Sequence, residues 1–198
     1  MKRILTFVAL FGAATVASAH TGHGTHSLSE GLTHPLGLDH LLAMVAVGVW
    51  SSLALPGAQR WQGPAAFLST MSIGAVLGAA GLVLPLTEAG IALSVALFGA
   101  MLLAGTRLPQ RAGLLLIAAA ASLHGLAHGA ELPASASFAA NDFVTYALGF
   151  LGSTTVLHLA GLSLGAAVLK LQRSLQPAVW RVLGVTLGAA GLLMLARI

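Results

Sequence analysis

Two short segments of the chain combine histidines with carboxylates at spacings that suit metal binding. Residues 34–40 read His-Pro-Leu-Gly-Leu-Asp-His, and residues 124–131 read His-Gly-Leu-Ala-His-Gly-Ala-Glu. The chain has no cysteine, so any metal ligands must be imidazole, carboxylate, thioether or backbone groups, a set that suits nickel, cobalt, zinc or copper. The candidate metal ligands are His34, Asp39, His40, His124, His128 and Glu131.

The second segment predicts a polar stripe on one helix face. His124 and His128 lie four residues apart and share that face, and Glu131 continues it three residues later. Two imidazoles at this spacing can bind one metal ion. We therefore expect these three side chains to act together.

The first segment predicts the start of a helix, with the polar residues His34, Asp39 and His40 close together there. Pro35 suits the first helical turn, which makes His34 a cap-region residue over the mouth of the helix. Asp39 lies about 100° around the axis from His40, so we expect it to orient an imidazole or to take a second coordination position. Met44 shares a face with His40, one turn further along the helix.

The elements that must position these residues are predicted to be membrane-spanning helices. Of the 198 residues, 57% are hydrophobic and only 7% are charged, whereas about a quarter of an ordinary soluble domain is charged. A run of about 20 apolar residues crosses a bilayer as a helix, so we predict an all-α membrane protein, a six-transmembrane helix bundle. The predicted spans are 35–55, 64–84, 88–106, 112–130, 143–169 and 178–196.

Three regions are predicted along the chain. Residues 1–19 have the basic start, the apolar run and the small residues before position 20 that mark a cleavable signal peptide, with an uncleaved first helix as the alternative. Residues 20–33 form a polar, His-rich periplasmic tail, mobile as far as Gly31, and residues 34–198 form the six-helix transmembrane domain. The tail histidines, which either collect metal or merely belong to a soluble tail, are His20, His23 and His26.

The charged loops predict the orientation in the membrane. With the mature N-terminus outside, six basic residues fall in inner loops and only Arg197 falls outside, as the positive-inside rule requires. We therefore predict a multi-pass protein of the bacterial inner (plasma) membrane with a periplasmic mature N-terminus. Because the first span runs inward and the fourth outward, both histidine segments should meet at the outer end and form one site. The inner basic residues are Arg60, Arg107, Arg111, Lys170, Arg173 and Arg181.

Two other patterns have structural explanations. Small residues four positions apart on a membrane helix predict a packing face. A single histidine in a helix bundle commonly hydrogen-bonds a neighbouring helix, which is the first explanation for His158; a place on a route through the bundle is the alternative. The glycine pairs are Gly74 and Gly78, Gly161 and Gly165, and Gly184 and Gly188.

The two histidine motifs resemble those of the HupE/UreJ family, nickel permeases and accessory proteins associated with hydrogenase and urease operons. The resemblance covers essentially the whole mature chain, and it rests on residues 34–48 and on residues 124–131. It implies nickel uptake for the maturation of hydrogenase or urease. The functional positions that it implies are His34, Asp39, His40, His124, His128 and Glu131.

The expected function is that of a permease and not of an enzyme. Ni2+ is the expected transported ion, with Co2+ or Zn2+ as alternatives, and no organic cofactor is expected. The chain has no Walker A pattern and no carboxylate at mid-membrane, which favours facilitated diffusion. The expected partners are the metal ion and the lipid bilayer, with no nucleic acid because the basic residues are dispersed; a homo-oligomer stays open. A membrane-embedded metalloenzyme and a non-transporting metal-binding accessory protein are the alternative functions.

Metal affinity should depend on pH if imidazoles are the ligands. Imidazole binds metal in its neutral form, so the affinity for Ni2+ should fall as the pH drops below about 6.5. Calorimetric titration of the purified protein with Ni2+ over about pH 8 to about pH 5 would measure this. An affinity that stays flat over that range would contradict a histidine site.

Overall fold

The structure is a computed structural model that describes residues 27–130 and 141–198. Within these residues every regular element is a helix, which confirms the predicted helical class. In chain order the elements are α2 (Leu28–Thr33), the 3-10 turn η1 (His34–Leu36), α3 (Leu38–Ala54), η2 (Gly57–Trp61), α4 (Gln62–Ala79), α5 (Thr87–Ala104), η3 (Gly105–Arg107), α6 (Gln110–Ala130), α7 (Asn141–Leu169) and α8 (Gln176–Leu195).

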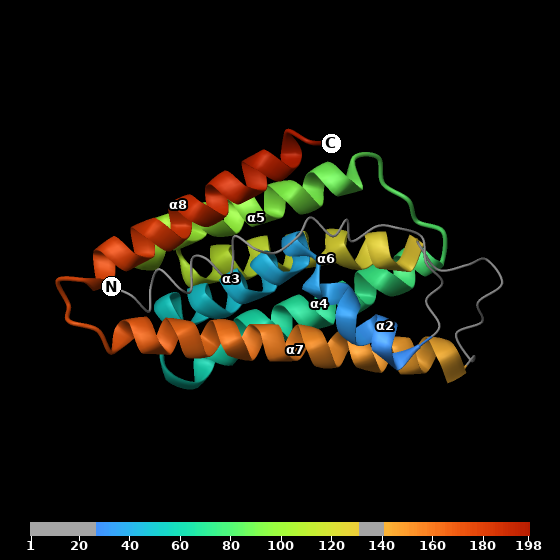
Figure 1. Cartoon of the computed structure of the whole chain (residues 1–198), viewed down its shortest axis with the longest axis horizontal. Coiled ribbons are helices and arrows are strands. Elements are labelled where there is room, and N and C mark those ends of the chain that lie inside the picture. Colours follow the sequence, from blue (N-terminus) through green and yellow to red (C-terminus); the bar gives the residue numbers. More distant parts are fainter. Residues whose placement is uncertain (1–26, 131–140) are drawn as a thin grey trace.

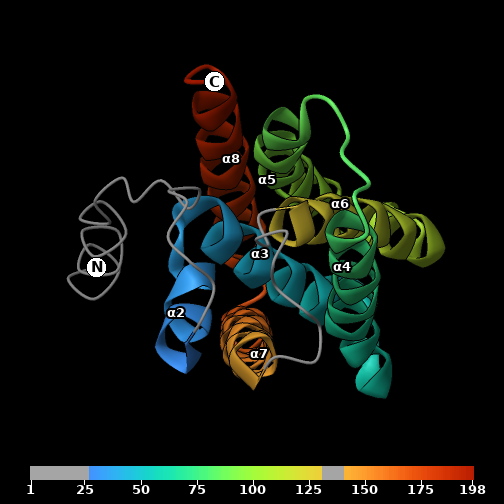
Figure 2. The same ribbon diagram turned by 90° about the vertical axis from the view of Figure 1, so that its right-hand side faces the viewer.

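Helix α3 occupies the middle of the bundle, and the other long helices surround it (Figure 2). Its side chains are apolar on nearly every side, and Met44, Val47 and Trp50 are buried, as expected for a core helix. Helix α7 packs along α3, while α5 and α8 lie side by side in another part of the bundle (Figure 1). The outer helices expose apolar side chains such as Leu192 and Leu193, which suits contact with lipid.

Glycines make the closest helix contacts in three pairs of helices. The opposed residues are Gly48 with Gly161 between α3 and α7, Gly74 with Gly125 between α4 and α6, and Gly99 with Gly188 between α5 and α8. At all of them except Gly188, an added methyl group would collide with the backbone of the opposing helix, so only glycine allows the approach. The predicted packing role of the repeated glycines is therefore confirmed for every one of them except Gly188, where an added methyl group would meet nothing.

Four helical segments are long and apolar enough to cross a membrane by length and composition. They are Thr87–Arg107, Gln110–Ala130, Val144–Leu169 and Gln176–Leu195. A fifth candidate joins Leu28–Leu36 to Leu38–Ala54, two parts that are bent by 75° relative to each other. The chain is thus a multi-pass helical membrane protein. The predicted count of six spans is not confirmed.

Helix α4 accounts for the difference in the count. It begins at the polar residue Gln62 and ends at Ala79, before the predicted end at residue 84. Gly81 has a φ of 93°, a left-handed conformation that stops a helix, and Pro85 has no amide hydrogen with which to continue one. The segment 80–86 therefore connects α4 to α5 without regular structure.

The N-terminal part of the described chain also differs from expectation. Ser27 and Glu30 form a capping box, in which the Ser27 hydroxyl accepts from the Glu30 amide and the Glu30 carboxylate accepts from the Ser27 amide at 3.0 Å. The expectation of a mobile segment is therefore wrong for residues 27–31, which start helix α2. The predicted signal peptide and the rest of the tail, including His20, His23 and His26, lie outside the described residues.

The glycine contact between α3 and α7 can be tested by adding one methyl group. Gly48→Ala should lower stability by about 1 to 3 kcal/mol, because the methyl group meets the backbone of His158 and Leu162. Gly152→Ala is the matched control, since nothing lies within 4 Å of its added methyl group. Thermal unfolding in one detergent, followed by circular dichroism, would compare them. Equal melting temperatures for Gly48→Ala and the parent protein would contradict the contact.

Candidate metal centre

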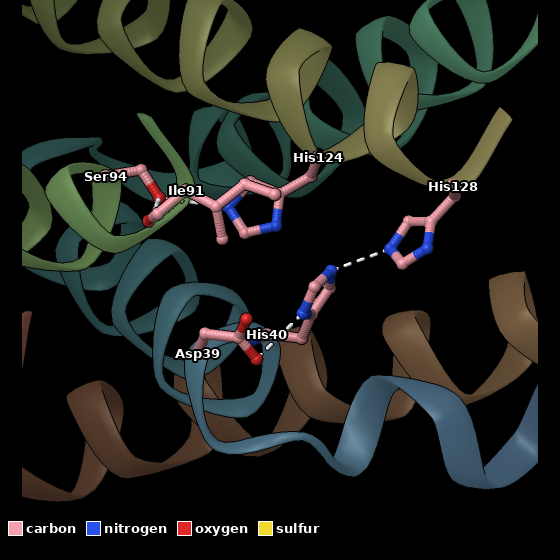
Figure 3. A network of polar contacts seen from close by, with 6 residues as sticks. All are labelled: Asp39, His40, Ile91, Ser94, His124 and His128. Atoms are coloured by element: carbon pink, nitrogen blue, oxygen red, sulfur yellow. Dashed lines mark hydrogen bonds and ion pairs between the residues drawn. The ribbon is translucent and has the colours of Figure 1, made fainter. Parts of the chain in front are cut away.

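Histidines from the two sequence motifs meet at one end of the bundle (Figure 3). His40 lies in the first turn of α3, directly after the bend, and His124 and His128 lie in the last two turns of α6. The ring centroid of His40 is 4.7 Å from that of His124 and 4.6 Å from that of His128. All three residues are buried. The structure thus brings the two motifs together, as the predicted topology required.

Asp39 holds the ring of His40 in one orientation. Its Oδ1 atom accepts from the backbone amide of His40 at 2.8 Å and lies 2.9 Å from His40 Nδ1. A carboxylate can only accept, so Nδ1 carries the hydrogen and Nε2 carries the lone pair. Asp39 therefore has the orienting contact that the sequence predicted, and it leaves the lone pair of His40 on Nε2, the nitrogen that could bind a metal ion.

Ser94 fixes the ring of His124 in a similar way. Its hydroxyl donates to the carbonyl of Ile91 at 2.7 Å, and its oxygen lies 2.9 Å from His124 Nε2 (Figure 3). Because the single hydroxyl hydrogen is used on Ile91, His124 must donate from Nε2 and carry its lone pair on Nδ1. Ser94 was not predicted from the sequence, because its only signal is a serine among apolar residues of its helix.

A short contact joins the two motifs directly. His40 Nε2 and His128 Nε2 lie 2.7 Å apart. A hydrogen therefore lies between the two nitrogens, and this hydrogen bond holds the two rings in place. One metal ion can bind both nitrogens only after that hydrogen has moved away, either to Nδ1 of His128 or to solvent. His40 and His128 are therefore a pair that either hydrogen-bonds or shares an ion.

The histidine side chains lie close together, but they do not form a complete coordination site for one metal ion. In the described part of the chain, no three His, Asp or Glu residues are placed to hold one ion together. Two nitrogens at about 2.1 Å from a tetrahedral zinc ion would lie about 3.4 Å apart, further than His40 Nε2 and His128 Nε2 are now. An ion would therefore have to separate the pair by less than an ångström.

Helix α7 supplies an aromatic wall around the histidines. The ring of His34 lies 4.6 Å from that of His128, and its Nδ1 atom lies 3.1 Å from the hydroxyl of Tyr146. Phe150 packs 4.6 Å from His128 and 5.9 Å from His34. His34 thus belongs to the cluster. Tyr146 and Phe150 were missed because aromatic residues in an apolar span are usually core residues.

Two further residues that the sequence singled out have different outcomes. Glu131 lies outside the described residues, so its role in the site stays a prediction. His158 was expected to hydrogen-bond a neighbouring helix, and this was wrong, since its Nδ1 atom lies 2.8 Å from the carbonyl of Thr154 in the same helix. We call His34, His40, His124 and His128 the histidine cluster below.

Removing the orienting carboxylate should weaken metal binding more than it weakens folding. Asp39→Ala should reduce Ni2+ affinity by roughly tenfold to a hundredfold, because a ligand imidazole loses its fixed orientation and part of its basicity. Ser72→Ala is a suitable control, since Ser72 is exposed and bonds only within α4. Calorimetry would measure both affinities. An Asp39→Ala affinity within about twofold of the parent value would show that Asp39 has no such role.

Comparisons with known proteins agree with the motifs. The family profile described as HupE / UreJ protein matches residues 8–194. The chain is also 38% identical to "Protein HupE" of Rhizobium leguminosarum bv. viciae over 195 residues, which covers 98% of this chain and 97% of that protein. No solved structure matches significantly. With a family match over nearly its whole length and this relative, the chain belongs to the HupE/UreJ family.

Proposed function

We propose that this chain is an inner-membrane permease that takes up a divalent transition metal, most favourably nickel, for the maturation of hydrogenase or urease. The observation that carries the proposal is the histidine cluster at one end of a membrane helix bundle, in which His40, His124 and His128 are buried and His34 is half-buried. Imidazoles are costly to bury among apolar helices unless they serve a function. Here four of them, from η1, α3 and α6, lie within one group.

The choice of nickel rests on the family resemblance and not on the ligands. Nitrogen and oxygen donors without thiolate also suit cobalt and zinc, and the intrinsic affinity order does not single out nickel. We propose that His40, His124 and His128 surround the ion, with His34 beside them and Asp39 orienting the ring of His40. Glu131 is proposed to lie at the rim and to attract the cation.

A route through the bundle is supported by a groove at the end opposite the histidine cluster. A groove of about 900 Å³ lies between the last turn of α3, the start of α6 and the end of α7, and its lining includes Arg60, Gln110 and Leu169. His40 and Ala54 mark the two ends of α3, about 21 Å apart at the rise of an α-helix. We propose that the cluster faces the periplasm and the groove faces the cytoplasm, with α4 as the remaining span.

Transport is proposed to be facilitated diffusion. In the residues that the structure describes, the acids are Glu30, Asp39, Glu88 and Asp142, each in the first turn of its helix. None lies in the middle of a described helix, where a carboxylate proton relay through the membrane would need one. The ion would then move down its own gradient, and dissipating a proton gradient should leave uptake unchanged.

Replacing histidines of the cluster tests the proposal. His124→Ala and His128→Ala should each reduce nickel uptake into proteoliposomes to the level of protein-free vesicles, because each removes one of the few nitrogen ligands. Ser69→Ala, on the exposed face of α4, should transport like the parent protein. Protein content and circular dichroism would verify insertion and folding of every variant.

The same assay separates permease from accessory protein. Nickel that binds to the parent protein at the expected affinity but never enters the vesicles would contradict transport and favour a metal-binding accessory role. Uptake that persists in both histidine variants would contradict the cluster as the transport site.

A further inference from the structure

One face of α7 carries a stripe of buried residues at every fourth position. From the end nearest the cluster inward, the stripe consists of Tyr146, Phe150, Thr154, His158 and Leu162. Thr154 is completely buried and His158 is 1% exposed, so two polar side chains lie one turn apart in the apolar middle of the helix. Burying polar side chains at such a position costs free energy unless they bind a partner.

The hydrogen bond of His158 fixes which of its nitrogens is available. Nδ1 lies 2.8 Å from the carbonyl oxygen of Thr154, and a carbonyl can only accept, so Nδ1 carries the hydrogen. The lone pair of the neutral ring is then on Nε2, which has no hydrogen-bond partner among the described residues. A backbone carbonyl holding the other ring nitrogen is the usual arrangement of a metal-binding histidine.

The hydroxyl oxygen of Thr154 is in the same situation. It is buried and has no hydrogen-bond partner in the part of the chain that the structure describes. Leaving a hydroxyl and an imidazole unsatisfied in an apolar interior costs about 1 to 3 kcal/mol for each group. Two such groups one turn apart on the same face of α7 therefore form a place where a bound polar species would be stabilised.

His158 lies midway between the histidine cluster and the groove. It is eight residues beyond Phe150, which contacts His128, and eight residues before Ala166, which lines the groove; each step corresponds to about 12 Å along a helix. The buried ring of Phe67 lies 5.7 Å from His124 and 5.0 Å from His158, between the two. The face of an aromatic ring attracts cations, so Phe67 does not oppose passage of one.

We propose that Nε2 of His158 is a second binding position for the divalent cation, an inner position between the histidine cluster and the groove. The proposal rests on the proposed function, which it extends by naming the residue that receives the ion from the cluster. One imidazole and one neighbouring hydroxyl bind a borderline cation weakly, and the ion keeps waters in its other coordination positions. Weak binding suits an intermediate position, which must also release its ion.

Two substitutions separate this role from a purely structural one. In His158→Asn the amide can still donate to the carbonyl of Thr154 but the ligand nitrogen is gone, whereas in His158→Gln an acceptor oxygen stands near the place of Nε2. We expect nickel uptake into proteoliposomes to fall at least about tenfold in His158→Asn and to recover partly in His158→Gln, because the polar acceptor has returned. The affinity of the cluster for Ni2+ should stay within about twofold of the parent value in both.

The control is Thr155→Val, because Thr155 is exposed and bonds only to Leu151 of its own helix. It should transport nickel like the parent protein. Uptake by His158→Asn within about twofold of the parent rate would overturn the inference while leaving the proposed function intact. Equal losses of uptake in the Asn and Gln variants, together with a lower melting temperature, would also overturn it, since they indicate a packing role.

A measurement that needs no transport decides the inference even if the parent protein proves not to carry nickel. The ring nitrogens of His158 can be followed by nitrogen NMR in detergent, with His158→Asn used to assign them. Adding Zn2+, a diamagnetic probe, should shift the Nε2 signal of His158 while Nδ1 stays protonated. An Nε2 signal that does not change after zinc has saturated the cluster would overturn the inner position.

Discussion

The hydrogen bond between His40 and His128 joins two parts of the bundle that make little direct backbone contact. Helix α6 packs mainly on α4, and α3 packs mainly on α7, so side chains fill the space between these two pairs. His40 and His128 bridge it at one end, and Trp50 packs against Gly113 of α6 towards the other. A seam closed by side chains can open through rotamer changes, whereas a seam closed by glycines cannot, because there the backbones themselves are in contact.

Along this seam three histidine rings are each held in one orientation by a hydrogen-bond partner, and the partner is of a different kind in each case. A carboxylate holds His40, a serine hydroxyl holds His124, and a backbone carbonyl holds His158. In each case the partner fixes which ring nitrogen carries the hydrogen, and the other nitrogen keeps the lone pair that a metal needs. In the middle of the bundle the backbone carbonyl has one advantage, since it orients an imidazole without burying a charge among apolar helices.

The meeting of the two histidine motifs was predictable from the sequence, whereas the ends of several helices were not. The spacing of His124 and His128, the loop charges and the glycine pairs each follow from local periodicity or from composition, and these are readable in one chain. The contacts of Ser94, Tyr146 and Phe150 were not predictable, because they depend on how each helix is rotated about its axis. The bend at Gly37 and the early end of α4 depend on single residues whose effect only tertiary packing decides.

The closed state of the cluster has a consequence for transport. A site with all its ligands already spread around an empty centre would hold a divalent ion tightly and release it slowly, which is useless for passage. In the proposed transport the ion would instead compete with the hydrogen bond between His40 and His128, so part of the free energy of coordination would be offset by the loss of that bond. When the ion left, the bond would form again and favour departure. The interaction that closes the resting cluster would therefore also help to empty a loaded one.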